Sequence, residues 1–156
     1  MDPTEFEYAG FWIRVWASVI DSVLVLIIIL PVLRMIYGEG YWADERMIKG
    51  PADFLLSFVA PAIAIVVFWI SRQATPGKMA IAAQIVDATT GGKPSNGQLI
   101  ARYAGYYLAA IPLFIGLIWV AFDPRKQGWH DKLAGTVVIR KKKGATQAVQ
   151  FNGPGA

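Results

Sequence analysis

The 156-residue sequence contains no cysteine, which excludes disulfides, thiolate metal sites and cysteine nucleophiles and leaves the redox compartment open. It is also poor in charge: 17% of the residues are charged, whereas a soluble domain carries about 25%. Hydrophobic residues make up 55% of the chain. The sequence therefore has too little polar surface to cover a water-soluble globule, and its length corresponds to one domain.

The N-terminus lacks the features of a secretory signal peptide. Its charged residues are acidic (Asp2, Glu5 and Glu7), with neither a basic start nor a small-residue cleavage site, so we expect no cleaved signal. The formal net charge is +4 and the pI is about 9.4, with the basic residues at the ends of apolar runs. This placement favours the lipid bilayer and anionic lipid head groups as partners over nucleic acid.

Two apolar runs are predicted to be transmembrane helices. The first, residues 11–33, has 23 residues, enough to cross a hydrocarbon core of about 30 Å at about 1.5 Å per residue. The second, residues 54–70, has 17 residues and no charge, which is the short limit for a span. Pro51 suits the start of the second helix, and Pro61 is expected to bend it.

A third apolar run, residues 103–122, is interrupted by Pro112 and Gly116. Residues 96–111 are predicted to form an amphipathic or interfacial helix, because their polar and apolar side chains fall on opposite sides. Residues 112–122 would form a short hydrophobic helix after it.

The basic residues predict the orientation of these segments. The two most basic regions, residues 71–102 and residues from 123 onward, should both be cytoplasmic, with the loop between the first two helices outside. A single crossing of the third run would place the most basic region outside. We therefore favour a re-entrant segment that turns near Pro112, and a single crossing is the alternative.

Two further stretches, residues 78–87 and 136–140, are predicted to be strands that pair as a small sheet at the membrane surface. Residues 144–156 have little to bury and are predicted to be a disordered tail. The expected fold is thus an all-α membrane protein with two transmembrane helices and a broken, re-entrant or third transmembrane segment. A small cytoplasmic β-hairpin-like element would complete this single domain over residues 1–143.

Arg14, Ser18 and Asp21 lie on one face of the first predicted helix, since Arg14 and Asp21 are seven residues or two turns apart. Asp21 falls near the middle of the run, where a charge costs about 2.5–3.5 kcal/mol on insertion scales. It therefore needs a partner, a water-filled cavity or a proton. Two interpretations stay open: an ion or proton site, and a buried hydrogen-bonded group that locks helices together. Arg14 favours anchoring, to lipid phosphates or to a carboxylate.

A second polar group, formed by Asp123, Arg125, His130 and Asp131, follows the third run directly. The single histidine with scattered carboxylates is a poor case for a metal site, so we expect no metal and no cofactor. With an ordinary pKa of about 6.5, His130 could shuttle protons. The favoured interpretation is an interfacial loop held by hydrogen bonds.

Three more cations, Lys78, Arg102 and Lys132, are predicted to face lipid head groups or the membrane interface. Lys78 ends the turn Thr75-Pro-Gly-Lys, which lacks the remaining glycines and the Ser or Thr of a phosphate loop. This turn is expected to fix the exit of the second helix.

Several of these motifs, taken in order, resemble the RDD family of small bacterial integral membrane proteins, named for an Arg and two Asp residues. The resemblance covers about residues 9–140. It rests on Gly10-Phe-Trp-Ile-Arg-Val-Trp-Ala-Ser-Val-Ile-Asp21, Thr75-Pro-Gly-Lys78, Ile85-Val-Asp87, Arg102, Phe122-Asp-Pro-Arg125 and His130-Asp-Lys-Leu-Ala-Gly-Thr-Val-Val138. It implies that Arg14 and Asp21 are the first two name residues and Asp131 the third, with Asp123 as a competitor.

The resemblance also implies a multi-pass protein of the bacterial cell (inner) membrane, with the basic loop and the C-terminal region cytoplasmic. The family's function is mostly unassigned, transport is the usual proposal, and cation/proton exchange has been suggested for some members. The first hypothesis is a homo-oligomeric transporter of a cation, proton or other small solute, in which Asp21 alternates between protonated and cation-paired forms. The alternative is a non-catalytic scaffold or accessory subunit that recruits a protein partner or anionic lipid. An enzyme is not expected, because the sequence contains no activated nucleophile and no paired acid and base.

Overall fold

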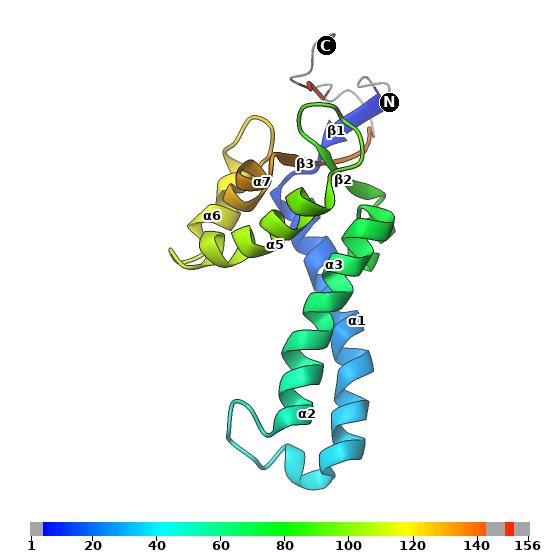
Figure 1. The fold of residues 1–156 in the computed structure, drawn as a ribbon, viewed down its shortest axis with the longest axis vertical. Helices are drawn as coiled ribbons and strands as arrows, with labels where there is room; N and C mark the ends of the chain where they lie inside the picture. Colours follow the sequence, from blue (N-terminus) through cyan, green and yellow to red (C-terminus); the bar gives the residue numbers. More distant parts are fainter. Residues whose placement is uncertain (1–4, 143–148, 152–156) are drawn as a thin grey trace.

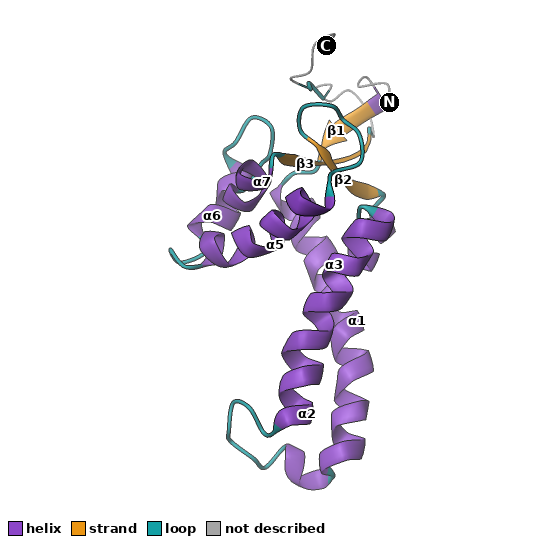
Figure 2. Ribbon diagram, in the orientation of Figure 1, coloured by secondary structure: helices purple, strands orange, loops and turns teal. Residues whose placement is uncertain are grey.

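The computed structural model describes residues 5–142 and 149–151. A long hairpin of two helices carries a small sheet and a bent helical arm at one end (Figure 1), and the same view separates helices, strands and loops (Figure 2). In chain order the elements are β1 (Phe6–Tyr8), α1 (Phe11–Tyr37), η2 (Glu39–Tyr41), α2 (Pro51–Phe54), η3 (Leu55–Val59), α3 (Ala60–Arg72), α4 (Pro76–Ala80), β2 (Ala83–Asp87), α5 (Asn96–Ala110), α6 (Ile115–Ile118), η4 (Trp119–Ala121), α7 (Trp129–Ala134) and β3 (Thr136–Lys141).

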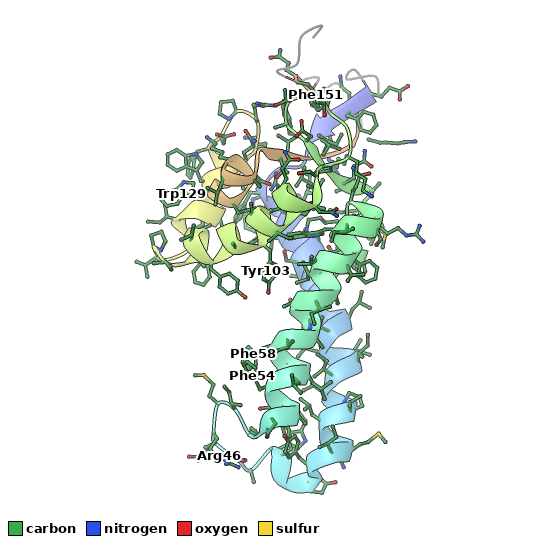
Figure 3. All side chains as sticks on the ribbon, viewed as in Figure 1. Arg46, Phe54, Phe58, Tyr103, Trp129 and Phe151 are labelled. Carbon is green, nitrogen blue, oxygen red and sulfur yellow. The ribbon has the colours of Figure 1, made fainter. Side chains whose placement is uncertain are left out.

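The two predicted transmembrane helices are confirmed as long apolar helices, each extending a few residues beyond its predicted run. α1 has 27 residues, and the second long helix, Pro51–Arg72, has 22 residues and comprises α2, η3 and α3. At about 1.5 Å per residue both exceed the thickness of a hydrocarbon core. About half of the large apolar side chains on these two helices are exposed on the surface of the chain, and Leu33 and Trp69 are buried. Helices that face lipid require such exposed apolar side chains. Phe54 and Phe58, for example, project from the second helix on the side away from α1 (Figure 3).

Pro61 lies directly after a π-helical turn in the second helix. A proline ring clashes with the carbonyl four residues earlier and cannot donate a hydrogen bond to it. The N–H of Ala60 instead bonds to the carbonyl of Leu55, five residues earlier, which widens the turn. Pro51 occupies the first turn of the helix, as its position in the sequence predicts.

The loop at the far end of the hairpin is organised around Asp53, whose side chain is buried. Its carboxylate accepts hydrogen bonds from the Tyr41 hydroxyl at 3.0 Å, the Ser57 hydroxyl at 3.0 Å and the Lys49 N–H at 2.8 Å. These bonds tie the loop to the start of the second helix.

The sheet at the other end has three antiparallel strands in the order β1-β3-β2. The predicted pairing of two strands is confirmed, with Ala83 opposite Arg140 and Asp87 opposite Thr136. Strand β1, which pairs Phe6 with Lys141, was not predicted. The predicted strand over 78–87 was too long: residues 76–80 form helix α4, because Thr75 caps it and Pro76 occupies its first turn.

Both faces of this sheet are covered. Ile85, Val138 and Ala83 pack with the helices, in a cluster that includes Trp69 and Leu99. On the opposite face, the buried cluster contains Phe6, Val86, Ala88, Val137, Ile139 and Val149. Phe151 packs against that second cluster and is labelled near the sheet in Figure 3. Residues 149–151, within the stretch predicted to be a disordered tail, thus contact the sheet, and the remainder of 144–156 lies outside the described residues.

The bent arm, α5 to α7, leaves strand β2 and returns to strand β3. A capping box starts α5, with Ser95 and Gln98 bonding to each other's backbone N–H groups. The helices on either side of residues 111–114 meet at 116°, and Leu113 and Phe114 at this corner have positive φ values of 50° and 62°. Since β2 and β3 are neighbours in one sheet, both ends of the arm lie at the same end of the molecule. This arrangement favours a re-entrant or interfacial arm over a single crossing.

Because the chain has no cysteine, single cysteines report directly on this topology. We expect Lys93→Cys and Lys132→Cys to react with an impermeant maleimide from the same side of intact vesicles, and Met47→Cys from the opposite side. All three positions are exposed. The unsubstituted chain provides the blank. Labelling of Lys93→Cys and Lys132→Cys from opposite sides would show instead that the arm crosses the membrane.

Candidate functional site

Three elements meet at the carboxylate of Asp131, which is fully buried at the start of α7. Arg14 of α1 donates a hydrogen bond from Nη1 to Oδ2 at 2.6 Å. Arg102 of α5 donates from Nη1 to Oδ1. The Gly128 N–H also donates to Oδ2, at 2.9 Å. We refer to Arg14, Arg102 and Asp131 as the Arg–Asp–Arg cluster.

The cluster keeps Asp131 ionised. Burial by itself would raise the pKa of Asp131, but the guanidinium groups of Arg102 and Arg14 outweigh it and hold that pKa well below its ordinary range. Each buried charge in the cluster is neutralised by its partner. If one partner is removed, the other charge stays buried without a counter-ion, which is unfavourable.

The two arginines extend this cluster to other parts of the fold. Arg14 donates from Nε to the Ala9 carbonyl at 2.9 Å and from Nη2 to the Lys126 carbonyl at 2.5 Å. Arg102 donates to the hydroxyl of Thr136, in β3, at 2.7 Å. The cluster therefore joins the first helix, both ends of the arm and the sheet.

Arg102 corrects a sequence-based prediction. Instead of facing lipid, its side chain is fully buried, with its guanidinium 5.4 Å from the Trp69 ring and 5.8 Å from the Tyr106 ring. The sequence shows that Arg102 lies on the polar side of an amphipathic helix. It does not show that this side packs beneath α7, and therefore it suggested a position at the lipid interface.

Asp21 is held by the turn that follows the second helix. Its Oδ2 accepts a hydrogen bond from the Thr75 hydroxyl at 2.5 Å, and its Oδ1 accepts one from the Gly77 N–H at 2.7 Å. The carboxylate thus satisfies donors at the start of α4, which otherwise lack partners. Arg14, two turns earlier on the same helix, extends to Asp131 and not to Asp21.

Gly77 makes this contact possible. A Cβ atom at this position would lie 2.0 Å from the carbonyl oxygen of Ala17 and 2.9 Å from the Asp21 carboxyl carbon. Only glycine allows α4 to approach α1 so closely. The turn Thr75-Pro-Gly-Lys78 thus docks against the first helix. Its predicted role was only to fix the exit of the second helix.

Lys78, also predicted to face lipid, is buried in the structure. Its ammonium nitrogen lies 5.8 Å from the centre of the Trp69 ring. Burial lowers the pKa of Lys78. The prediction failed because docking of α4 against α1 turns this side chain inward.

Asp123 and Lys132 form a second ion pair, at the loop between the arm's last two helical segments. Asp123 also accepts hydrogen bonds from the backbone N–H groups of Arg125 and Gln127, both at 3.1 Å. The Arg125 guanidinium donates to the Ala88 carbonyl at 2.7 Å. Lys132 is half-exposed, in keeping with an interfacial position. Of the two aspartates that competed for the third name position, Asp131 is the one that pairs with Arg14.

His130 stacks on Tyr106, with ring centroids 3.9 Å apart, and only 3% of its side chain is exposed. Burial is the main reason that its pKa falls to about 3, even though the nearby Asp131 favours the protonated ring. Among residues 5–142 and 149–151, no group of three or more His, Asp or Glu side chains is placed to hold a metal ion.

A groove of about 450 Å³ separates α1 from the bent arm. Ser18 and Ser22 line it from the first helix, and Arg14 and His130 line one end. Asp21 is not among its lining residues. Of the three polar residues predicted to share one face of the first helix, Arg14 and Ser18 reach this groove, whereas Asp21 bonds to α4.

Comparison with known proteins agrees with this arrangement of motifs. The model of the RDD family matches residues 8–135. The chain belongs to the RDD family. No solved structure matches it.

Similar proteins include YxaI of Bacillus subtilis, which is 32% identical over an alignment of 149 residues that covers 85% of this chain and 97% of YxaI. YteJ of the same organism, described as an uncharacterized membrane protein, is 28% identical over 86% of this chain and 82% of its own length. Rickettsia prowazekii RP437 is 40% identical over 75 residues, which span 48% of this chain and 41% of that protein.

The Arg–Asp–Arg cluster predicts that this RDD protein will not tolerate loss of the central charge. Asp131→Asn leaves two buried guanidinium groups without a carboxylate, and we expect it to destabilise the fold by about 3–5 kcal/mol. Unfolding of the purified protein in detergent measures the difference. Asp44→Asn is the matched control, since Asp44 pairs with Arg46 on the surface, and it should change nothing measurable. Equal stability of the two variants would contradict a structural role for Asp131.

His130 predicts a loss of stability on mild acidification. The folded pKa of about 3 lies below the ordinary 6.5, so only the unfolded chain takes up this proton between those values. The stability is complete above pH 6.5 and falls as the pH drops, by about 2 kcal/mol at pH 5. His130→Phe keeps the stacking on Tyr106 and should flatten the stability profile between pH 7 and pH 5, measured by thermal unfolding. Since His130 is the only histidine, the same slope in both proteins would exclude this origin.

Proposed function

We propose that this RDD protein is a non-catalytic membrane scaffold or accessory subunit, which recruits a protein partner or anionic lipid on the side that carries the sheet. The observation that supports this proposal most directly is that Asp21 and Asp131, the two aspartates that match the family's name pattern, both accept hydrogen bonds from other parts of the protein. Asp131 bonds to two arginines, and Asp21 bonds to Thr75 and Gly77. Such bonds are expected of carboxylates whose role is to hold helices together.

The geometry of Asp21 argues against a role as an ion carrier. Each of the two Asp21 oxygens already accepts a hydrogen bond from the protein, one from the Thr75 hydroxyl and one from the Gly77 N–H. These bonds use part of the acceptor capacity that a bound cation would need. They also hold α4 against α1, so a structural role explains both of them.

The sheet end offers the surface for recruitment. Arg72, Lys93 and Lys141 are exposed in the regions before and after the bent arm, and Lys132 is exposed in its last helix. Cations placed next to membrane segments each attract anionic head groups by about 1 kcal/mol. The same surface would bind an acidic protein partner.

A second candidate function, transport of a cation, proton or other small solute, is favoured by the groove. Ser18 and Ser22 line it beside Arg14, which gives one face of α1 a polar stripe. Two long helices and a short arm do not enclose a pathway, so this function requires a homo-oligomer in which a second copy closes the groove.

Paired variants separate these functions. In a scaffold, Asp21→Asn and Gly77→Ala both weaken the contact of α4 with α1, and both should lower the unfolding temperature in detergent. Gly97→Ala is the control, because a Cβ atom at Gly97 would lie 3.9 Å from its nearest neighbour, the Ser95 hydroxyl oxygen, and would therefore fit without a clash. Vesicles containing the unsubstituted protein should show no cation or proton flux above protein-free vesicles. A flux that Asp21→Asn abolishes and Gly77→Ala retains would overturn the scaffold proposal in favour of transport.

A further inference from the structure

The groove between α1 and the bent arm has the dimensions of a ligand site. Its volume of about 450 Å³ falls within the range of about 300–1,000 Å³ typical of small-molecule pockets. On α1 its lining runs from Phe11 to Val23, a length of about 18 Å at about 1.5 Å per residue. The groove is thus long and narrow, and it follows a helix long enough to span the membrane.

The lining changes character along this length. Val19 and Val23 of α1, with Leu117 and Ile118 of the arm, form an apolar wall that the small hydroxyl of Ser22 interrupts. Arg14, Tyr106 and His130 lie at the other end, where α1 begins beside the sheet. One end therefore suits a hydrocarbon chain and the other a polar group, which is the pattern of an amphiphile.

His130 contributes two hydrogen-bonding atoms to the polar end that the protein does not satisfy. Both of its ring nitrogens are buried and have no hydrogen-bond partner in the part of the chain that the structure describes. Nε2 lies 3.4 Å from Asp131 Oδ2 and makes no hydrogen bond with it. Burying polar atoms without a partner is unfavourable, so a small turn of the ring that brings a nitrogen to the groove would be stabilised by a ligand that bonds to it.

The polar end also carries positive charge. Arg14 uses three of its five N–H donors within the protein, at Ala9, Asp131 and Lys126, and so keeps two. The charge of Asp131 is already balanced by the Arg–Asp–Arg cluster. An anionic head group would complement this end.

We propose that the groove binds one anionic phospholipid, with an acyl chain along the apolar wall and the phosphate at the end formed by Arg14, Tyr106 and His130. The bilayer supplies such a molecule directly, since large apolar side chains of the groove lining, including Val19, Ile118 and Phe114, are exposed on the surface of the chain. The proposal does not depend on the scaffold role, because a transporter would contain the same groove.

Native mass spectrometry of the protein, extracted from vesicles of equal phosphatidylglycerol and phosphatidylcholine with matched chains, tests this. We expect one phosphatidylglycerol to be retained per chain, in about tenfold preference over phosphatidylcholine. His130→Phe, which keeps the ring and loses both nitrogens, should reduce this preference. Inorganic phosphate added in excess should not displace the lipid, because it lacks the acyl chain.

Two tryptophan substitutions locate the lipid. Val19→Trp fills the groove and should abolish retention, whereas Val32→Trp lies on the same helix outside the groove and should leave it intact. Thermal unfolding in detergent checks that both variants remain folded. Equal retention of the two lipids, or retention that survives Val19→Trp, would overturn the proposal. So would a dimer that Val19→Trp dissociates, because a second copy would then occupy the groove.

Discussion

The fold depends on the neutralisation of one buried carboxylate by two buried guanidinium groups. Arg14 and Asp131 are separated by 117 positions in the chain, and Arg102 and Asp131 by 29, yet Asp131 bonds to both arginines. In the part of the chain that the structure describes, Arg14 donates the hydrogen bonds that join the hairpin to the bent arm, at Asp131 and at the Lys126 carbonyl. Because an unpaired charge in this position is costly, the ion pairs select one docking geometry of the arm over the alternatives that apolar packing alone would permit.

Asp21 is compensated in a different way. A charge in the body of an apolar helix is expensive in a bilayer. Here the chain returns to it after the second helix, and a five-residue helix, α4, brings a hydroxyl and a backbone N–H to the two oxygens. Arg14 and Asp21 of the first helix thus find their partners in later segments of the chain. These polar residues specify how the later segments dock.

Much of the architecture could be predicted from apolar run length and β-branched stretches, because both depend on local sequence. The two spans, the interrupted arm and the pairing of 83–87 with 136–140 belong to this class. Arg102 and Lys78 do not. Their positions depend on which face of α5 and α4 is covered, and only the tertiary fold decides that. Gly77 is similar: its motif indicated a turn, whereas the need for glycine comes from Ala17 in a different helix.

The strand order β1-β3-β2 has a consequence for biogenesis. The first strand, just before α1, pairs with the last, so Phe6 lies opposite Lys141. During synthesis α1 can enter the bilayer long before residue 131 or the last strand leaves the ribosome. Until then Arg14 lacks its carboxylate and β1 lacks its neighbour. Closure of the domain is therefore a late event that joins the two ends of the described chain, and nascent chains that stall before it expose an unpaired strand edge.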